Sequence, residues 1–253
     1  MTTDIATWRE EITVRDYETD FTGRWKPSSF FRVMQLVAGI QSNSIGYNFY
    51  KLMEKGMAWV LARVRINIED FPQIDERIVY HTWLNGVQQK LFFIREFEIT
   101  TMDGRRLARA TTASILIDPH SRRILSPRSL PGHNPTNAVQ VTPLELLDKL
   151  DVPEGMPPVY RLQAAYSDLD VMGHVNNANY IDWVCSGFPL AHYREQQISR
   201  LQLNFMREVK AGDEVTVCAV KQDENGRDWS VSGECAGMRA FEAAVDWQPR
   251  AIK

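Results

Sequence analysis

A short stretch in the second half of the chain combines carboxylates, an imidazole, amides and a glycine. Asp168, Asp170 and His174 lie within seven residues of one another, and Gly173 stands among them. Apolar residues then follow at the spacing of one helical face, namely Tyr180, Ile181, Val184 and Cys185. A carboxylate and an imidazole beside the start of a helix can hold and activate a water molecule, so this stretch is a candidate active site.

The start of this helix adds a second chemical feature. Asn176 or Asn177 is expected to be the N-cap, and Gly173 can adopt the positive φ that turns a strand over 166–170 into the helix. A helix N-terminus carries unpaired N–H groups and about half a positive charge, which can polarise a carbonyl oxygen. A purely structural turn would use the same residue types. The number of such residues in one stretch favours chemistry.

Composition narrows the class of protein. The chain has 253 residues and 44% hydrophobic content, enough for one large domain or two of about 120 residues. A net charge of −3 provides no global field for nucleic acid or an anionic membrane. Three cysteines favour neither a disulfide framework nor a zinc site. A polar N-terminus and the lack of an apolar run of membrane-spanning length predict a cytoplasmic protein without membrane insertion.

An internal repeat favours two halves. Shifted by 150 positions, Asp20 matches Asp170 and Arg24 matches His174, whereas Arg63 matches Arg200 at an offset of 137. The smaller offset means that the first half carries 13 additional residues, which we assign to a short helix before Gly56. The expected division is an N-terminal domain over residues 1–126, a proline-rich linker over 127–158 and a C-terminal domain over 159–253.

Each half is expected to contain a strand, a long buried helix and several antiparallel strands, which is an α+β fold. The first helix should begin at Pro27, and a short helix should follow over 50–54. Alternation from 58 to 69 predicts a strand with one apolar face made of Val60, Ala62, Val64, Ile66 and Ile68. Further strands are expected over 10–16, 77–84, 90–100 and 107–117, and in the second half over 199–205, 214–220, 228–235 and 239–247.

The residues of the candidate site carry a family resemblance. The string Asp168-Leu-Asp-Val-Met-Gly-His-Val-Asn-Asn-Ala-Asn-Tyr180 resembles the signature of hot-dog-fold thioesterases, and Leu201 to Val209 resembles a strand of the acyl-acyl carrier protein thioesterases. The resemblance implies a tandem hot-dog fold, in which two antiparallel sheets, each wrapped around a long helix, join side by side. It also implies hydrolysis of fatty acyl-acyl carrier protein to free fatty acid.

The resemblance assigns roles to particular residues. Asp170 matches the essential aspartate, His174 the histidine and Glu208 the second acidic residue, while the backbone N–H at Asn176 or Asn177 faces the thioester carbonyl. Two departures stand out: Met172 replaces an asparagine that is frequent in the family, and Val209 replaces a cysteine. A thiol nucleophile at that position is therefore excluded. We expect Asp170 or Glu208 to be the general base on water, with no metal and no cofactor.

The same resemblance places the acyl chain in the first half, with a pocket that draws on Phe30, Met34, Val37, Trp59 and Val60. The partner would be an acyl carrier protein with a phosphopantetheine-linked acyl chain. A basic concentration could attract this acidic partner: Arg105, Arg106, Arg109, Arg122, Arg123 and Arg128. An acyl-CoA thioesterase and a non-catalytic acyl-binding protein remain alternatives, and homodimer formation, chain length and chain saturation stay open.

Overall fold

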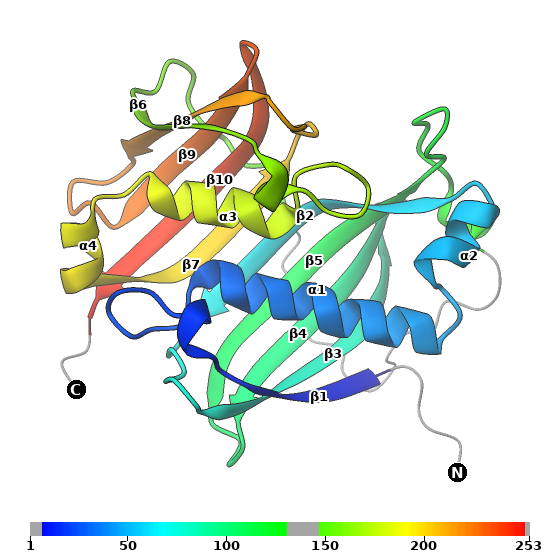
Figure 1. Cartoon of the computed structure of the whole chain (residues 1–253), viewed down its shortest axis with the longest axis horizontal. Helices are drawn as coiled ribbons and strands as arrows, with labels where there is room; N and C mark the ends of the chain where they lie inside the picture. The colour runs from blue at the N-terminus through cyan, green and yellow to red at the C-terminus, as the bar shows by residue number, and fades with distance from the viewer. Residues whose placement is uncertain (1–6, 131–146, 251–253) are drawn as a thin grey trace.

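Alternating strands and two amphipathic helices assemble into one antiparallel sheet with both long helices on the same face (Figure 1). The structure is a computed structural model, and it describes residues 7–130 and 147–250. Ten strands lie in the order β1-β3-β4-β5-β2-β7-β10-β9-β8-β6. Each half contributes five neighbouring strands and one long helix. The predicted α+β tandem hot-dog architecture is therefore confirmed.

The elements occur in the same order in both halves. The first half contains, with their bounds, β1 Thr7–Thr13, η1 Asp16–Glu18, α1 Pro27–Ser44, α2 Phe49–Glu54, β2 Ala58–Ile68, β3 Arg77–Gln88, β4 Phe92–Thr101, β5 Arg106–Ile117 and η2 Pro127–Ser129. The second half contains β6 Pro158–Gln163, η3 Tyr166–Asp168, α3 Asn177–Ser186, α4 Leu190–Glu195, β7 Gln196–Phe205, β8 Glu214–Lys221, β9 Asp228–Cys235 and β10 Met238–Pro249. Both halves carry a six-residue helix after the long one, α2 and α4, so our assignment of the extra residues to a short helix is wrong. Most of the difference lies in the long helix, which has 18 residues in α1 and 10 in α3.

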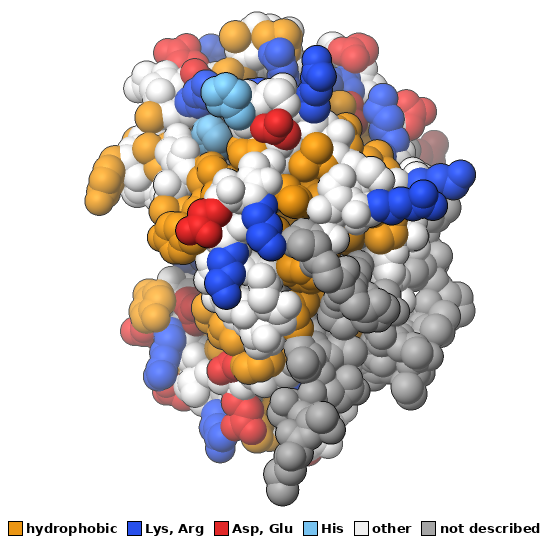
Figure 2. Space-filling model, turned by 90° about the vertical axis from the view of Figure 1, so that its right-hand side faces the viewer, with side chains coloured by type: hydrophobic (Ala, Val, Ile, Leu, Met, Phe, Trp, Pro, Cys, Tyr) orange, Lys and Arg blue, Asp and Glu red, His pale blue; other side chains and the backbone are white. Residues whose placement is uncertain are grey.

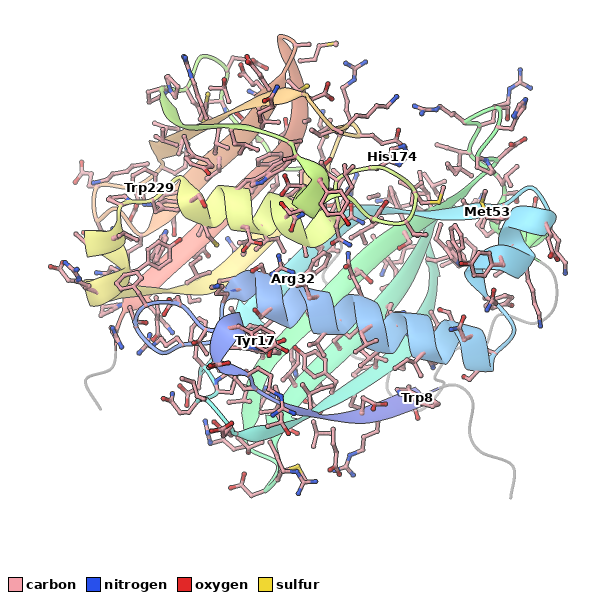
Figure 3. The ribbon with its side chains drawn as sticks, viewed as in Figure 1. Trp8, Tyr17, Arg32, Met53, His174 and Trp229 are labelled. Carbon is pink, nitrogen blue, oxygen red and sulfur yellow. The ribbon has the colours of Figure 1, made fainter. Side chains whose placement is uncertain are left out.

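The two halves join along one strand pair. β2 and β7 run antiparallel from Arg63 opposite Asn204 to Asn67 opposite Arg200, so the two expected sheets form one continuous sheet. The helices also meet across this junction, where an Arg32 Nη2 donates to Asn179 Oδ1 at 3.0 Å (Figure 3). α1 and α3 run in opposite directions across the sheet (Figure 1). The start of α3 therefore points toward the first half.

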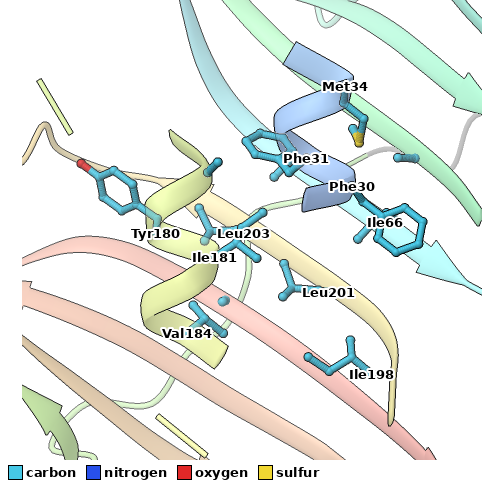
Figure 4. Close-up of a cluster of buried hydrophobic side chains, with 14 of the residues drawn as sticks. Phe30, Phe31, Met34, Ile66, Tyr180, Ile181, Val184, Ile198, Leu201 and Leu203 are labelled. Atoms are coloured by element: carbon cyan, nitrogen blue, oxygen red, sulfur yellow. The ribbon is translucent and has the colours of Figure 1, made fainter. Parts of the chain in front are cut away.

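The core fills the space between these helices and the sheet. Figure 4 shows Phe30 and Met34 of α1 beside Ile66 of β2, and Ile181 of α3 beside Leu203 of β7. All five side chains are at most 4% exposed. Burying a side chain of this size stabilises the fold by about 1.5–3 kcal/mol. One cluster of apolar side chains therefore fixes the positions of both helices against a single sheet.

One predicted strand face is wrong because β2 contains a bulge. The register against β5 shifts between Leu61 and Arg63, so that Leu61 faces Ser114 while Arg63 faces Ala113. An extra residue at a bulge moves the following side chains to the other face. Trp59 and Leu61 consequently share the helix-covered face with Val64, Ile66 and Ile68. Val60 lies on the opposite face, against the prediction.

Other local features differ from the predictions. Tyr166–Asp168 forms a 3₁₀ turn where a strand was expected, since Asp168 N–H bonds back to the Ala165 carbonyl. Strand β6 begins at Pro158, inside the segment that we assigned to the linker, and pairs with β8. Helix α4 was not predicted. Residues 131–146 of the expected linker lie outside the described residues.

Candidate active site

The candidate site is built on a loop that occurs twice in the chain. In the second half, Asp170 Oδ1 accepts hydrogen bonds from Met172 N at 2.8 Å and His174 N at 3.4 Å. In the first half, Asp20 Oδ1 accepts from the two corresponding N–H groups at 2.7 and 3.3 Å. One oxygen of Asp170 therefore closes the loop, as Asp20 does. Met172 keeps this geometry because only its backbone takes part.

The loop delivers the chain to the start of α3. Asn176 is the N-cap, and its Oδ1 accepts from Ala178 N at 2.9 Å. Asn177, the first residue of the helix, makes no hydrogen bond through its N–H within the described part of the chain. In the first half the equivalent residue is Pro27, which has no N–H. Only the second copy can offer a backbone donor here.

His174 and Glu208 form a pair beside this helix start. His174 Nε2 lies 3.5 Å from Glu208 Oε2, and the two side chains are 29% and 38% exposed. Arg122 Nη2 lies 3.1 Å from the same carboxylate oxygen. Figure 3 shows His174 in the loop where the two halves meet. A carboxylate can fix the orientation of an imidazole, and solvent access allows this pair to take up a water molecule.

The first copy has different chemistry at the same places. Arg24 replaces His174, and Phe71 stands at the position that corresponds to Glu208 at the offset of 137. The Arg24 guanidinium lies 5.6 Å from the centre of the Phe71 ring, and it also bonds to the Gln197 side chain. Burial lowers the Arg24 pKa. At these two positions the first copy therefore has no acid–imidazole pair.

The residues around Glu208 are fixed by the core. Val209 is fully buried, and its N–H donates to the Tyr180 hydroxyl at 3.0 Å. Burial raises the pKa of Tyr180 to about 12, so the phenol stays neutral and can accept this bond. Burial likewise raises the pKa of Cys185 to about 12, and the pKa values of Cys218 and Cys235 are also raised. None of the three thiols is activated as a nucleophile.

A cavity of about 450 Å³ runs between α1 and the sheet of the first half. Of the predicted pocket residues, Met34 and Trp59 line the cavity, whereas Phe30, Val37 and Val60 do not. Phe30 and Val37 are fully buried in the packing of α1. The lining also includes residues without an earlier assignment, such as Phe31, Leu61, Phe93 and Arg95.

The second half contributes to this cavity through one described residue, Asn177. The start of α3 therefore reaches the cavity wall. Asp170, His174 and Glu208 do not line the cavity; they lie in the loops next to that helix start, Asp170 and His174 just before it. The arrangement combines an apolar chamber, an unpaired N–H group at its edge and an acid–imidazole pair beside that edge. These are the parts that hydrolysis of an acyl compound needs.

The six arginines do not form one patch. Arg105, Arg106 and Arg109 pair with acidic side chains at one end of β5. Arg122, Arg123 and Arg128 follow the other end of that strand, where Arg122 contacts Glu208 of the candidate site. Figure 2 views the molecule from this side, and blue Lys and Arg side chains lie near pale-blue histidines in its upper part. The two groups are close in the sequence, but the length of β5 separates them in space.

Two residues were missed as parts of the site. The sequence placed Arg122 only in a basic patch, because its contact with Glu208 joins residues 86 positions apart. Arg95 was read as part of an ordinary strand. The sequence held one signal of a role for Arg95: the residue stands between the apolar residues Ile94 and Phe97 of a predicted strand.

Comparison with known families agrees with this geometry. The model of the acyl-ACP thioesterase N-terminal domain matches residues 6–127, and that of the C-terminal domain matches residues 157–249. The chain belongs to the acyl-ACP thioesterase family. Acyl-ACP thioesterases from Bacteroides thetaiotaomicron (TM-score 0.88, 24% identity) and Umbellularia californica (TM-score 0.79, 19% identity) have similar structures. The match covers 98% and 97% of this chain and 100% and 98% of those chains, which supports the fold.

The first curated acyl-ACP thioesterases that match are longer than this chain. A palmitoyl-acyl carrier protein thioesterase of Gossypium hirsutum is 26% identical over 219 residues, which is 80% of this chain and 53% of that protein. The chain thus spans about half the length of the first curated relatives that it matches. In residues 7–130 and 147–250, no helix has both the length and the hydropathy for crossing a membrane. Those residues also contain no group of three His, Cys, Asp or Glu side chains placed around one metal ion.

Proposed function

We propose that the protein hydrolyses the thioester of fatty acyl-acyl carrier protein and releases a free fatty acid. The observation that carries the proposal is the position of Asn177, which lines an acyl-sized cavity next to the His174 and Glu208 pair and whose N–H has no partner in the described residues. Family membership supports the same reaction. The proposed chemical division assigns the acyl chain to the first half and catalysis to the second.

The thioester carbonyl oxygen would accept a hydrogen bond from Asn177 N–H and be stabilised there as negative charge develops. Such a donor is typically worth about 10²–10³-fold in rate. A water oxygen then attacks the carbonyl carbon while Glu208, through His174, or the second oxygen of Asp170 takes its proton. Collapse of the tetrahedral intermediate breaks the C–S bond. His174 is placed to protonate the leaving thiolate, which gives a carboxylic acid and a thiol.

The carrier protein would approach the end of the molecule where Arg122, Arg123 and Arg128 lie. Arg123 and Arg128 are exposed, and neither makes an ion pair within the described part of the chain. Unpaired exposed cations can attract an acidic partner over several ångströms. The phosphopantetheine arm would then enter between this surface and the start of α3. A cytoplasmic location remains our proposal from the sequence.

Turnover with matched substrates tests the proposal. Purified protein is given one acyl chain either on acyl carrier protein or on coenzyme A, and thiol release is followed in both reactions. We expect a higher kcat/KM with the carrier protein. Higher kcat/KM with coenzyme A would identify an acyl-CoA thioesterase instead, and tight acyl binding without any thiol release would identify an acyl-binding protein.

A further inference from the structure

A buried arginine stands in the wall of the apolar cavity. Arg95 lies on β4 and is 8% exposed, yet it lines the chamber together with Phe93 and Phe97 of the same strand. Its cross-strand neighbour Thr112 is also part of the wall. Arginine is among the residues least often buried without an ionic partner, because removing its charge from water is costly. Its presence in the wall of an acyl chamber therefore indicates a functional role.

The guanidinium of Arg95 is held by neutral groups only. Nη1 donates to Gln41 Oε1 and to Thr82 Oγ1, and Nη2 donates to Ser42 Oγ at 3.4 Å. A guanidinium has five N–H donors, so these three bonds leave two donors for a further acceptor. In residues 7–130 and 147–250, no carboxylate forms an ion pair with Arg95. Burial lowers its pKa to about 10, so the group remains a cation at neutral pH.

The position of Arg95 along the cavity is set by α1. Arg32 of α1 bonds to Asn179 near the start of α3, and Ser42 of α1 bonds to Arg95. Ten residues of α helix separate Arg32 from Ser42, which corresponds to a rise of about 15 Å. The guanidinium therefore lies toward the end of the chamber that is remote from the start of α3. A thioester held at Asn177 would place the distal part of its acyl chain near Arg95.

A plain alkyl chain is a poor partner for this group. Packing methylene groups against the two remaining donors would leave those two N–H groups of a buried cation without acceptors, which is unfavourable. An oxygen atom on the chain would accept those hydrogen bonds, and bonds to charged donors are the stronger kind. A site that is built to hydrogen-bond its substrate discriminates strongly against the analogue that lacks the polar atom.

We propose that Arg95 is a specificity-determining residue that selects acyl chains with an oxygen acceptor, a hydroxyl, keto or carboxylate group, in their distal part. The inference rests on the proposed function, because it takes the cavity to be the acyl site. It adds a substrate class that a purely apolar pocket would not favour. Gln41 and Ser42 of α1 and Thr82 of β3 then act as positioning residues that hold the guanidinium.

The test compares three acyl groups of equal length on acyl carrier protein, which end in a methyl, a hydroxyl or a carboxylate group. We expect the wild-type protein to favour at least one oxygen-bearing chain by about 10–100-fold in kcat/KM. The hydroxyl and carboxylate arms distinguish a neutral from an anionic acceptor. Arg95→Met should abolish this preference and favour the methyl-ended chain. Arg109→Met, on an exposed side chain paired with Glu98, is the matched control.

Calorimetric binding of the free acids separates this inference from the reaction. If no acyl carrier substrate is hydrolysed but the oxygen-bearing acids bind more tightly than the methyl-ended acid, the proposed reaction fails and the role of Arg95 stands. Equal kcat/KM and equal affinity for all three chains in the wild-type protein would overturn the inference. The wild-type comparison decides the matter even if Arg95→Met does not fold, and an unchanged preference in a folded Arg95→Met protein would also overturn it.

Discussion

The first residue of each long helix differs by one hydrogen-bond donor. Asn177 lines the cavity and has an N–H without a partner in the residues that the structure describes, whereas Pro27 has no N–H at the equivalent position. The residues before them, Asn176 and Lys26, have nearly the same extended backbone, with ψ of 135° and 144°. Proline fits the first position of a helix without strain. Pro27 therefore shows that the first position of such a helix can lack the N–H donor while the fold is kept.

We predict that Asn177→Pro lowers kcat by about 10²–10³-fold, the usual effect of losing one oxyanion donor. Its melting temperature should remain close to that of the wild type. Asn177→Ala is the matched control, because it removes the side chain and keeps the N–H. Steady-state kinetics and thermal unfolding of both variants give the answer. If Asn177→Pro kept the wild-type kcat, the oxyanion role of α3 would be wrong.

Asp170 has two roles that substitution can separate. One oxygen accepts two loop N–H groups, and Asp20 makes the same bonds in the half without acid–base groups. An asparagine side chain can still accept these bonds through its carbonyl oxygen, but it is not a base. We predict that Asp170→Asn and Asp20→Asn change the free energy of unfolding by similar amounts. Only Asp170→Asn should lower kcat, by about 10²–10⁴-fold.

The contrary result is also informative. If Asp20→Asn and Asp170→Asn reduced kcat equally, Asp170 would be a loop residue alone, and the pair of His174 and Glu208 would supply the base. The sequence predicted Asp170 and His174 as candidate site residues because they share one short motif. It could not identify the contact of Arg122 with Glu208, because that contact depends on how two distant loops meet.

At the level of elements, β9 and β10 press an aromatic ring against a glycine. Gly233 lies opposite Phe241, and a Cβ atom at Gly233 would overlap the Phe241 ring. The ring is fully buried and makes a T-shaped contact with Tyr180 of α3, with 5.6 Å between ring centres. Tyr180 in turn binds Val209, next to Glu208. These contacts thereby fix the distance of α3 and of the Glu208 loop from the sheet.

We predict that Gly233→Ala destabilises the protein by about 1–3 kcal/mol, the usual cost of overpacking a core. Urea unfolding measures this loss. Because the displaced ring would push on Tyr180, kcat should fall as well. The double variant Gly233→Ala/Phe241→Leu removes the overlap and should be less destabilised than the sum of the single changes. An additive result would mean that the ring does not transmit the change.

Some element boundaries followed from the sequence. Strand β9 and the first residue of α1 were predicted to the residue, because alternation and Pro27 define them. The bulge in β2 was not predictable, since Val60 and Leu61 are both apolar and either phase fits the pattern. The 3₁₀ turn at 166–168 depends on a backbone bond that no side-chain pattern announces.

On the scale of the whole molecule, two similar halves hold different parts of one proposed reaction. The first copy keeps the loop carboxylate Asp20 but has Arg24, Pro27 and Phe71 where the second has His174, Asn177 and Glu208. Its cavity is lined almost entirely from its own elements, together with Asn177 of the other half. Each half is therefore incomplete alone, and the pairing of β2 with β7 brings the cavity to the helix start.

Arginines at the two ends of β5 allow one end to be tested and the other to serve as the control. Arg123 and Arg128 follow the end beside the candidate site, whereas Arg105 stands just before the other end, paired with Asp70. We predict that Arg123→Glu/Arg128→Glu raises KM for acyl-acyl carrier protein about tenfold at low salt, with kcat unchanged, because an acidic carrier would be repelled. Rising salt should shrink the difference, since surface charges are screened. Arg105→Glu should leave KM unaltered, and an equal effect at both ends would exclude a local docking surface.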